Sequence, residues 1–439
     1  MHNKMSEMRE TTTARAMFSL KSLAGVLRAL GAGVLVVAVS IYLFQGWSHG
    51  NDISRYCTLL ALTLLLALVG FGSGHWLREA KGARLFLTLA LASVPANFTI
   101  LGAFIYSRLG SPSVAYPTFA TWQVGSLSMA LWLTAGALAL LLPVTWLGFM
   151  VLARRSTARL TALYLAANAV LLMPIRDTGV VAWGILALMG VVLIGTRAAV
   201  AADGSLRTPE GITARALQVL PAIVILGRAV SFYTLNASLY AATAIAVFLV
   251  LRSVSVQCES SPCLHRFLDR LSVLPAVIAA VYVADLVTAA FSIVASAGLP
   301  VFAFTAAGFL LEISTRAVYS GAGYRRGAAG VVGAGLLANL VVHAGVTSAA
   351  LCLAGGLGIL VYGYLVTQRL VFTSGCVVLL AGLGYQVYHA VTVFDLGSWG
   401  SLAALGFAAI LSGSLVDRYG TALKSATVLW ARRFRSWEY

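Results

Sequence analysis

The chain has 439 residues, of which 60% are hydrophobic and only 10% are charged, and its formal net charge is +16. Soluble domains are roughly 45–50% apolar and about 25% charged, so the composition excludes a water-soluble fold. In a soluble chain such a basic charge would point to nucleic acid, but here the apolar excess extends over the whole length in blocks that can cross about 30 Å of hydrocarbon. We therefore predict an all-α bundle that crosses the bilayer many times, with no nucleic-acid partner.

The amino-terminal segment 1–28 is predicted to be a cytoplasmic tail. Within it, residues 12–28 place apolar side chains at helical spacing among Arg15, Lys21 and Arg28. This pattern is typical of an amphipathic helix that lies on anionic lipid headgroups. A positively charged stop signal with no separate role accounts for the same residues.

The segment 29–415 is predicted to be a transmembrane helical domain with about fourteen spans, and roughly twelve or thirteen also fit. None of the loops between the spans is long enough for a large soluble domain. The expected spans are 29–46, 57–74, 86–107, 126–153, 160–175, 178–196, 216–235, 237–251, 272–294, 300–319, 328–350, 352–368, 372–394 and 398–415.

The basic residues determine the expected orientation. With the amino terminus inside, most arginines and lysines between the spans fall on one side, and the other side holds Arg55, Arg108 and Arg176. This asymmetry predicts cytoplasmic termini and a multi-pass protein of a bacterial inner membrane. The carboxyl-terminal segment 416–439 mixes basic and apolar residues and is predicted to be a second amphipathic helix on the cytoplasmic leaflet.

Glycines at small-xxx-small spacing, such as Gly70 and Gly74 or Gly323 and Gly327, predict close packing of helices. The spacing serves helices of one chain and helices of separate chains equally well. The expected partners are therefore the lipid bilayer and either other membrane subunits or further copies of this chain.

Three ionisable residues fall inside predicted spans, and counting from the span ends places Arg228, Asp285 and Glu312 near the bilayer midplane. A charge that faces lipid at that depth costs about 2.5–3.5 kcal/mol, so all three are expected to point inward. Arg316 follows Glu312 by one helical turn, which is the favourable order for an ion pair.

Two interpretations of these charges stay open. Arg228 and Asp285 have opposite signs and matching predicted depth, so with Glu312 and Arg316 they can form a purely structural clasp. Alternatively, Asp285 or Glu312 exchanges protons, or Arg228 holds an anionic group, in a central cavity of the kind that transporters use.

Two histidines and three asparagines are further polar residues inside predicted spans. His343 and His389 lie at similar predicted heights in parallel spans, where they can relay protons, bind a metal or a haem, or form hydrogen bonds in packing. No cofactor is predicted, and haem or a metal at these histidines is the alternative. Asn97, Asn168 and Asn339 are expected to join helices by hydrogen bonds.

These features favour a secondary transporter or flippase-like carrier with a polar site at the midplane, and they disfavour an enzyme. The first alternative is a non-catalytic membrane subunit that anchors or assembles a larger complex, with the buried charges acting as internal staples. The second alternative is an intramembrane enzyme or haem carrier centred on His343 and His389.

Overall fold

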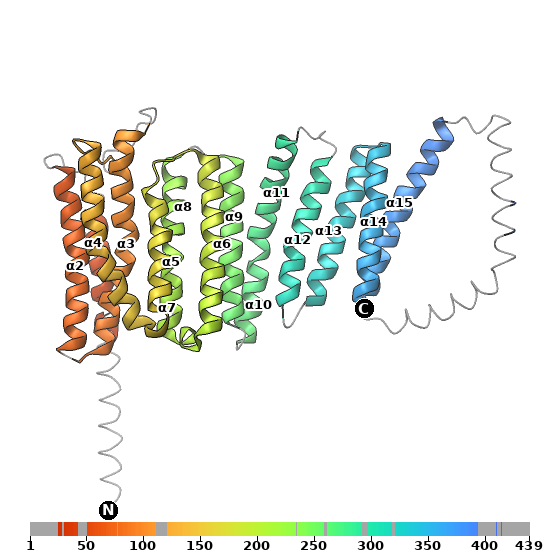
Figure 1. Cartoon of the computed structure of the whole chain (residues 1–439). Coiled ribbons are helices and arrows are strands. Elements are labelled where there is room, and N and C mark those ends of the chain that lie inside the picture. Colours follow the sequence, from red (N-terminus) through yellow and green to blue (C-terminus); the bar gives the residue numbers. More distant parts are fainter. Residues whose placement is uncertain are drawn as a thin grey trace, which may run out of the picture. The chain divides into compact units, whose positions relative to one another are not determined.

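The computed structural model describes residues 25–28, 30–42, 51–76, 78–110, 121–233, 235–258, 261–291, 297–317 and 321–393, together with 410 and 414. These residues form helices joined by short turns, and no β-strand occurs among them (Figure 1). The all-α prediction is confirmed for this part of the chain. Most of the amino-terminal tail and the whole carboxyl-terminal amphipathic segment lie outside the described residues.

Eleven helices of the described part are long and apolar enough to cross a membrane. They are Gly25–Tyr42, Asp52–His75, Ala80–Leu109, Leu127–Leu152, Thr178–Ala202, Pro209–Phe232, Ala237–Gln257, Pro262–Ala290, Gly298–Arg316, Val346–Val366 and Arg369–Thr392. Helices of this length and composition fit an integral membrane protein with many spans. The count of fourteen and the orientation of the termini stay predictions.

Three expected spans account for the difference in count. The span 160–175 is a helix of only 13 residues, α5 (Thr157–Ala169), followed by a single 3₁₀ turn. The span 328–350 belongs to α13 (Gly321–Val342), which carries Arg325 and Arg326 in its first two turns. Apart from residues 410 and 414, the span 398–415 lies outside the described residues.

The chain divides into two compact units, Met1–Thr234 and Leu235–Tyr439. In the first unit, α3 (Ala80–Leu109) packs against both α2 (Asp52–His75) and α4 (Leu127–Leu152). The described part of this unit also contains Gly25–Tyr42, α5, α6 (Thr178–Ala202), α7 (Pro209–Leu217) and α8 (Leu220–Phe232). Helices α2, α4, α6 and α7 each begin with a side-chain N-cap. The capping residues, Asn51, Ser126, Asp177 and Thr208, each accept a hydrogen bond from a backbone N–H of the first turn.

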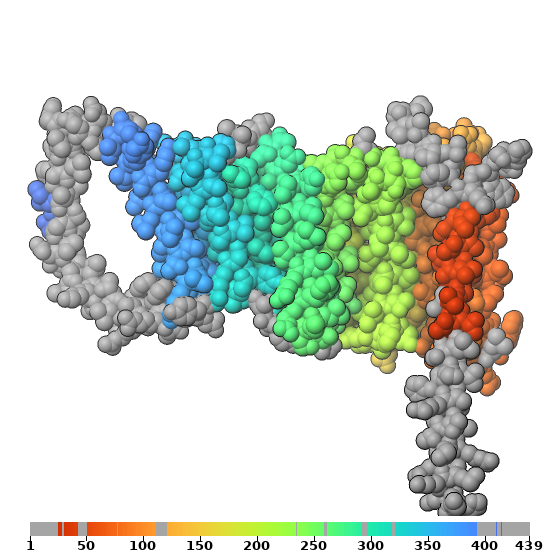
Figure 2. Space-filling view, turned by 180° about the vertical axis from the view of Figure 1, so that it is seen from behind, coloured from red at the N-terminus to blue at the C-terminus, as the bar shows by residue number. Residues whose placement is uncertain are grey.

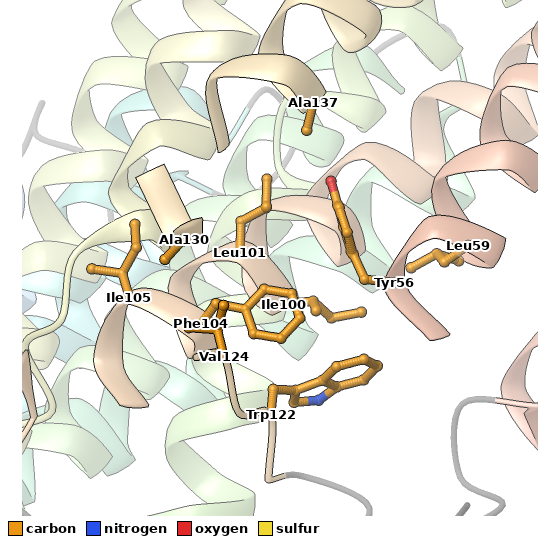
Figure 3. Close-up of a cluster of buried hydrophobic side chains, with 10 residues drawn as sticks. All are labelled: Tyr56, Leu59, Ile100, Leu101, Phe104, Ile105, Trp122, Val124, Ala130 and Ala137. Carbon is orange, nitrogen blue, oxygen red and sulfur yellow. The ribbon is translucent and has the colours of Figure 1, made fainter. Parts of the chain in front are cut away.

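The core of the first unit at one end of α3 contains three aromatic rings in contact (Figure 3). Phe104 lies edge-to-face between Tyr56 and Trp122, and both pairs of ring centroids are 5.9 Å apart. Edge-to-face pairs add about 0.5–1.5 kcal/mol to the burial of the rings. This cluster joins α2 and α3 to the segment before α4.

The three arginines predicted on the outer side are each held by a neighbour in the first unit. Arg55 is buried and its guanidinium lies 4.3 Å from the centroid of the Trp122 ring. Arg108 Nε donates a hydrogen bond of 2.7 Å to the Val124 carbonyl, and Arg176 lies over the Tyr106 ring. These contacts fasten the ends of the helices where the three residues lie.

In the described part of the second unit, seven helices follow one another along the chain, and most of them pack on their neighbours (Figure 1). They are α9 (Ala237–Gln257), α10 (Pro262–Leu271), α11 (Val273–Ala290), α12 (Gly298–Arg316), α13, α14 (Val346–Val366) and α15 (Arg369–Val393). The turn from α14 to α15 is tight, because Thr367 adopts a left-handed conformation with φ 56°. A Cβ added at Gly363 would lie 2.5 Å from the Phe372 nitrogen, so glycine allows the two backbones to meet.

The two predicted glycine pairs behave differently. A Cβ added at Gly70 would lie 2.9 Å from Leu87 Cγ, and one at Gly74 would lie 3.2 Å from Ala83 Cβ, so this pair packs α2 closely on α3. Gly323 has open space around its Cβ position, and Gly327 reaches only ordinary contact distance. The spacing therefore identifies a packing face in α2, and the second pair is not a close contact.

Candidate functional site

A buried arginine that was expected in a loop is the centre of the charged residues in the second unit. Because α9 extends to Gln257, beyond the predicted end at 251, Arg252 lies inside the helix and is only 1% exposed. Its Nε donates a hydrogen bond of 3.0 Å to Oε2 of Glu312, and its Nη1 contacts Oδ1 of Asp269. One guanidinium thus joins α9, α10 and α12 and contacts two carboxylates.

The carboxylate of Asp269 lies in a sealed polar cluster. Ser255 Oγ donates a hydrogen bond of 2.7 Å to Asp269 Oδ1, and it lies 3.1 Å from His265 Nδ1. His265 Nε2 is 3.3 Å from Asp269 Oδ2, without the geometry of a hydrogen bond. All three residues are buried. Removing one charge from such a cluster is costly, because its partner stays desolvated.

The predicted pair of Glu312 and Arg316 is present, with 3.1 Å between Oε1 and Nε. Both side chains are about one-third exposed, at 31% and 35%. Glu312 therefore has two arginine partners. It lies one turn before the end of α12, not at the predicted midplane of its span.

Asp285 lies at one end of the helix pair α11 and α12, and Glu312 lies at the other end. Asp285 comes five residues before the end of α11 and faces the first turns of α12, where Gly298 and Phe302 lie. Phe302 and Glu312 are about 15 Å apart along the helix axis at 1.5 Å per residue. The predicted matching depth of Asp285 and Glu312 is thus corrected. The span that ends at Ala290 begins at Pro262, ten residues before the expected start, which shifts Asp285 away from its centre.

A shallow depression of about 340 Å³ opens beside Asp285. Its other lining residues are Val281, Ala284, Thr288, Gly298 and Phe302, so the walls are mainly apolar. The hydroxyl of Thr288 donates to the Ala284 carbonyl at 2.9 Å, within its own helix. Among the described residues no ion pair to Asp285 occurs, and this carboxylate is exposed.

Arg228 lies on α8 in the first unit, where it is partly buried. Asp285 belongs to the second unit, so the two residues are not brought together within one unit. The pairing of Arg228 with Asp285 stays a prediction.

The two histidines lie at different places in the second unit. His343 directly follows α13, and its carbonyl accepts a hydrogen bond of 2.7 Å from Ser348 Oγ. His389 lies on α15 with its ring stacked on Tyr385, at a centroid distance of 6.4 Å. In the described part of the chain, no group of three or more His, Cys, Asp or Glu side chains is placed to hold a metal ion. A haem or metal at these histidines stays a prediction.

The three asparagines are buried and bonded. Asn97 Nδ2 donates to Thr63 Oγ1 on α2 at 3.0 Å, and Asn339 Nδ2 donates to Ser348 Oγ on α14 at 3.1 Å. Asn168 Nδ2 bonds instead to the Tyr164 carbonyl of its own helix, at 2.8 Å. Two of these amides therefore join neighbouring helices.

Sequence reasoning missed Arg252, Ser255, His265 and Asp269, because all four were expected in or next to a cytoplasmic loop. A usable signal is present in α10, where His265, Asp269 and Ser272 recur at intervals of four and three residues. That interval predicts a polar face on one side of a helix. It does not identify Arg252 as the partner.

The long apolar helices define the class of the chain as an integral membrane protein with many spans. No protein-family model, curated protein or solved structure matches it.

Proposed function

We propose that the chain is a secondary transporter or flippase-like carrier in which Asp285 contacts the transported ion or substrate. The observation that carries this proposal is the contrast between the two acidic residues of α11 and α12. Glu312 has two arginine partners, whereas Asp285 has an exposed carboxylate in an open depression. A carboxylate within a span is costly, so an unpaired one is a functional candidate.

The chemistry of the depression supports a proton or a cation as the group that Asp285 contacts. Its walls supply apolar surface that includes Phe302, while Asp285 supplies the only acidic group among the lining residues. An aromatic face beside a carboxylate suits an organic cation. Carboxylates within spans also act as proton relays in pumps and transporters.

Proteoliposomes that contain the purified chain test the proposal. Trapped pyranine reports proton movement when a panel of charged and neutral solutes is added outside, and dithionite quenching reports transfer of a fluorescent phosphatidylglycerol between leaflets. We expect the wild type to move protons or the lipid probe, and Asp285→Asn to abolish that movement.

Asp177→Asn is the matched control, because it makes the same chemical change at an exposed residue and asparagine still caps α6. It should retain wild-type movement. The proposal fails if Asp285→Asn moves protons and lipid at the wild-type rate, or if the wild type moves neither.

A non-catalytic membrane subunit is the second candidate. The observation that favours it is the closed network around Arg252, in which Asp269 and Glu312 both contact the guanidinium. Charges held in this way act as internal staples. For this function, neutralising Asp285 would leave every flux unchanged, and the chain would purify in mild detergent as part of a larger, defined complex.

A further inference from the structure

The depression beside Asp285 holds one charged group among apolar walls. Asp285 and Thr288 are the only polar side chains among the residues that line it. The Thr288 hydroxyl donates to the Ala284 carbonyl at 2.9 Å and to the Asp285 carbonyl at 3.0 Å, so its hydrogen is already bonded within α11. The carboxylate of Asp285 is therefore the one side-chain group of the lining that offers a ligand a charge.

The length of α11 places this carboxylate within the hydrocarbon, near its boundary. The helix has 18 residues and is about 27 Å long at 1.5 Å per residue, close to the hydrocarbon thickness of about 30 Å. Asp285 comes five residues before the end of α11, or about 7.5 Å below it. Both Asp285 and Val281, one turn earlier, are exposed. Figure 2 also shows that α11 has a face that other described helices leave uncovered.

The lining disfavours two classes of charged ligand. Calcium and magnesium ions take six or more oxygen ligands, whereas the depression supplies a single carboxylate. Phosphate and other anions lack a partner, because no lysine or arginine lines the depression. The remaining class is a molecule with a positive charge at one point and apolar surface elsewhere.

We propose that the depression binds an amphiphile that carries a protonated amine and no phosphate. The ammonium group donates hydrogen bonds to the Asp285 carboxylate, and the apolar chain lies against Val281 and Phe302. A carboxylate exposed to hydrocarbon is costly, and an ammonium partner offsets that cost. The depression of about 340 Å³ lies at the lower end of the range for small-molecule sites, roughly 300–1,000 Å³. The assignment rests on the proposed carrier function, since it names the class of molecule that the carrier takes.

Binding of radiolabelled dodecylamine to the full chain in phosphatidylcholine nanodiscs tests the proposal without measuring transport. At neutral pH this amine is protonated, and empty nanodiscs give the background. We expect saturable binding to the wild type. Asp285→Asn should weaken it by about tenfold or more, because a hydrogen bond between charged groups is lost. Asp285→Glu retains the charge and should lose less affinity.

Two matched controls accompany these variants. Asp177→Asn removes an exposed carboxylate from the first unit and should bind dodecylamine like the wild type. Phe302→Ser should weaken binding by about fourfold or more, the equivalent of one buried methylene. Phe304→Ser should have no effect, because Phe304 is exposed on the same helix and does not line the depression.

Two competitors distinguish the possible sources of the amine. Ethanolamine carries the amine without an apolar chain, and phosphatidylethanolamine in the nanodisc carries it beside a phosphate. Neither should displace dodecylamine from the wild type. Displacement by an equal concentration of ethanolamine would assign the site to small free amines, and displacement by phosphatidylethanolamine would assign it to a lipid headgroup. Either result would overturn the proposal.

The proposal is also overturned if Asp285→Asn, folded by circular dichroism, binds dodecylamine with wild-type affinity, or if the wild type does not bind above background. Its failure differs from failure of the carrier function. A wild type that moves protons through Asp285 but does not bind dodecylamine keeps the carrier function and loses this ligand. A wild type that binds dodecylamine but moves neither protons nor lipid keeps the binding site and loses the carrier function.

Discussion

Arg252 on α9 donates a hydrogen bond of 3.0 Å to Glu312 on α12, sixty residues later in the chain. The same guanidinium contacts Asp269 on α10, so a single side chain holds three helices of the second unit together. The arginine is buried, whereas Glu312 is about one-third exposed at 31%. The buried pair of Arg252 and Asp269 therefore contributes most of the stability that the network provides.

Replacing Arg252 by methionine should destabilise the second unit strongly. It leaves the Asp269 carboxylate buried without a cation, a change that costs about 3–5 kcal/mol in comparable buried pairs. Thermal unfolding in detergent measures the loss. Arg316→Gln is the control, because its pair with Glu312 is partly exposed and should contribute no more than about 1 kcal/mol. Equal losses of stability in the two variants would contradict the claim that the buried pair contributes more than the partly exposed pair.

The close approach of α14 and α15 gives a second prediction. Gly363→Ala places a methyl group against the backbone of Phe372 and should cost about 1–3 kcal/mol. Gly358→Ala lies on the same helix with open space around its Cβ position, so it should be neutral or stabilising by up to about 1 kcal/mol. Unfolding midpoints of the two variants measure the difference. A destabilising Gly358→Ala would show that this open face contacts another chain.

The hydrogen bond between Asn97 and Thr63 should appear as a coupling energy between α3 and α2. A double-mutant cycle with Asn97→Val and Thr63→Val isolates that energy, which averages about 0.6 kcal/mol and reaches about 1.7 kcal/mol for bonds between membrane helices. Unfolding free energies of the four proteins supply the cycle. Additive losses in the double variant would mean that the two side chains act independently.

The turn after α6 should be sensitive to acid. Hydrogen bonds from the Ser205 side chain, the Ser205 backbone and the Ser156 hydroxyl lower the pKa of Asp203 below its ordinary value of 3.8. Because the pKa is lower in the folded state, the ionised carboxylate stabilises the fold above pH 3.8, and this stabilisation is lost as the pH falls through the lowered pKa.

Unfolding midpoints measured between neutral pH and about pH 2 test this linkage, since a lowered carboxyl pKa titrates in that range. The Asp203→Asn variant should be less stable than the wild type at neutral pH, and the difference should shrink in acid. Parallel pH curves for the two proteins would contradict the assignment.

The sequence predicts the class of fold well and the charged site only in part. Long apolar blocks identify the helices, and the spacing of Glu312 and Arg316 identifies their pair because it is a local, one-turn relationship. The contacts of Arg252 are not local. They depend on α9 continuing past its predicted end and on α10 packing against it, and neither can be read from hydropathy.

Depth along a span is the other quantity that the sequence leaves open. A shift of ten residues in the start of the span containing α10 and α11 moves Asp285 from its centre toward one end. Asp285 lies five residues before the end of α11 and Glu312 one turn before the end of α12, so the two residues are far apart although the two helices pack together. Span boundaries therefore limit how well a site can be assembled from single residues.

Water access at position 285 tests the central claim most directly. In a background with the five native cysteines replaced by serine, Asp285→Cys, Ala306→Cys and Asp177→Cys are treated with a charged, membrane-impermeant thiol reagent. Ala306 is buried on α12 at 4% exposure, and Asp177 is exposed. The account predicts rapid labelling of the Asp285→Cys and Asp177→Cys variants and none of Ala306→Cys. If Asp285→Cys resists the reagent as Ala306→Cys does while Asp177→Cys reacts, the assignment of Asp285 to a solvent-reached carrier site is contradicted.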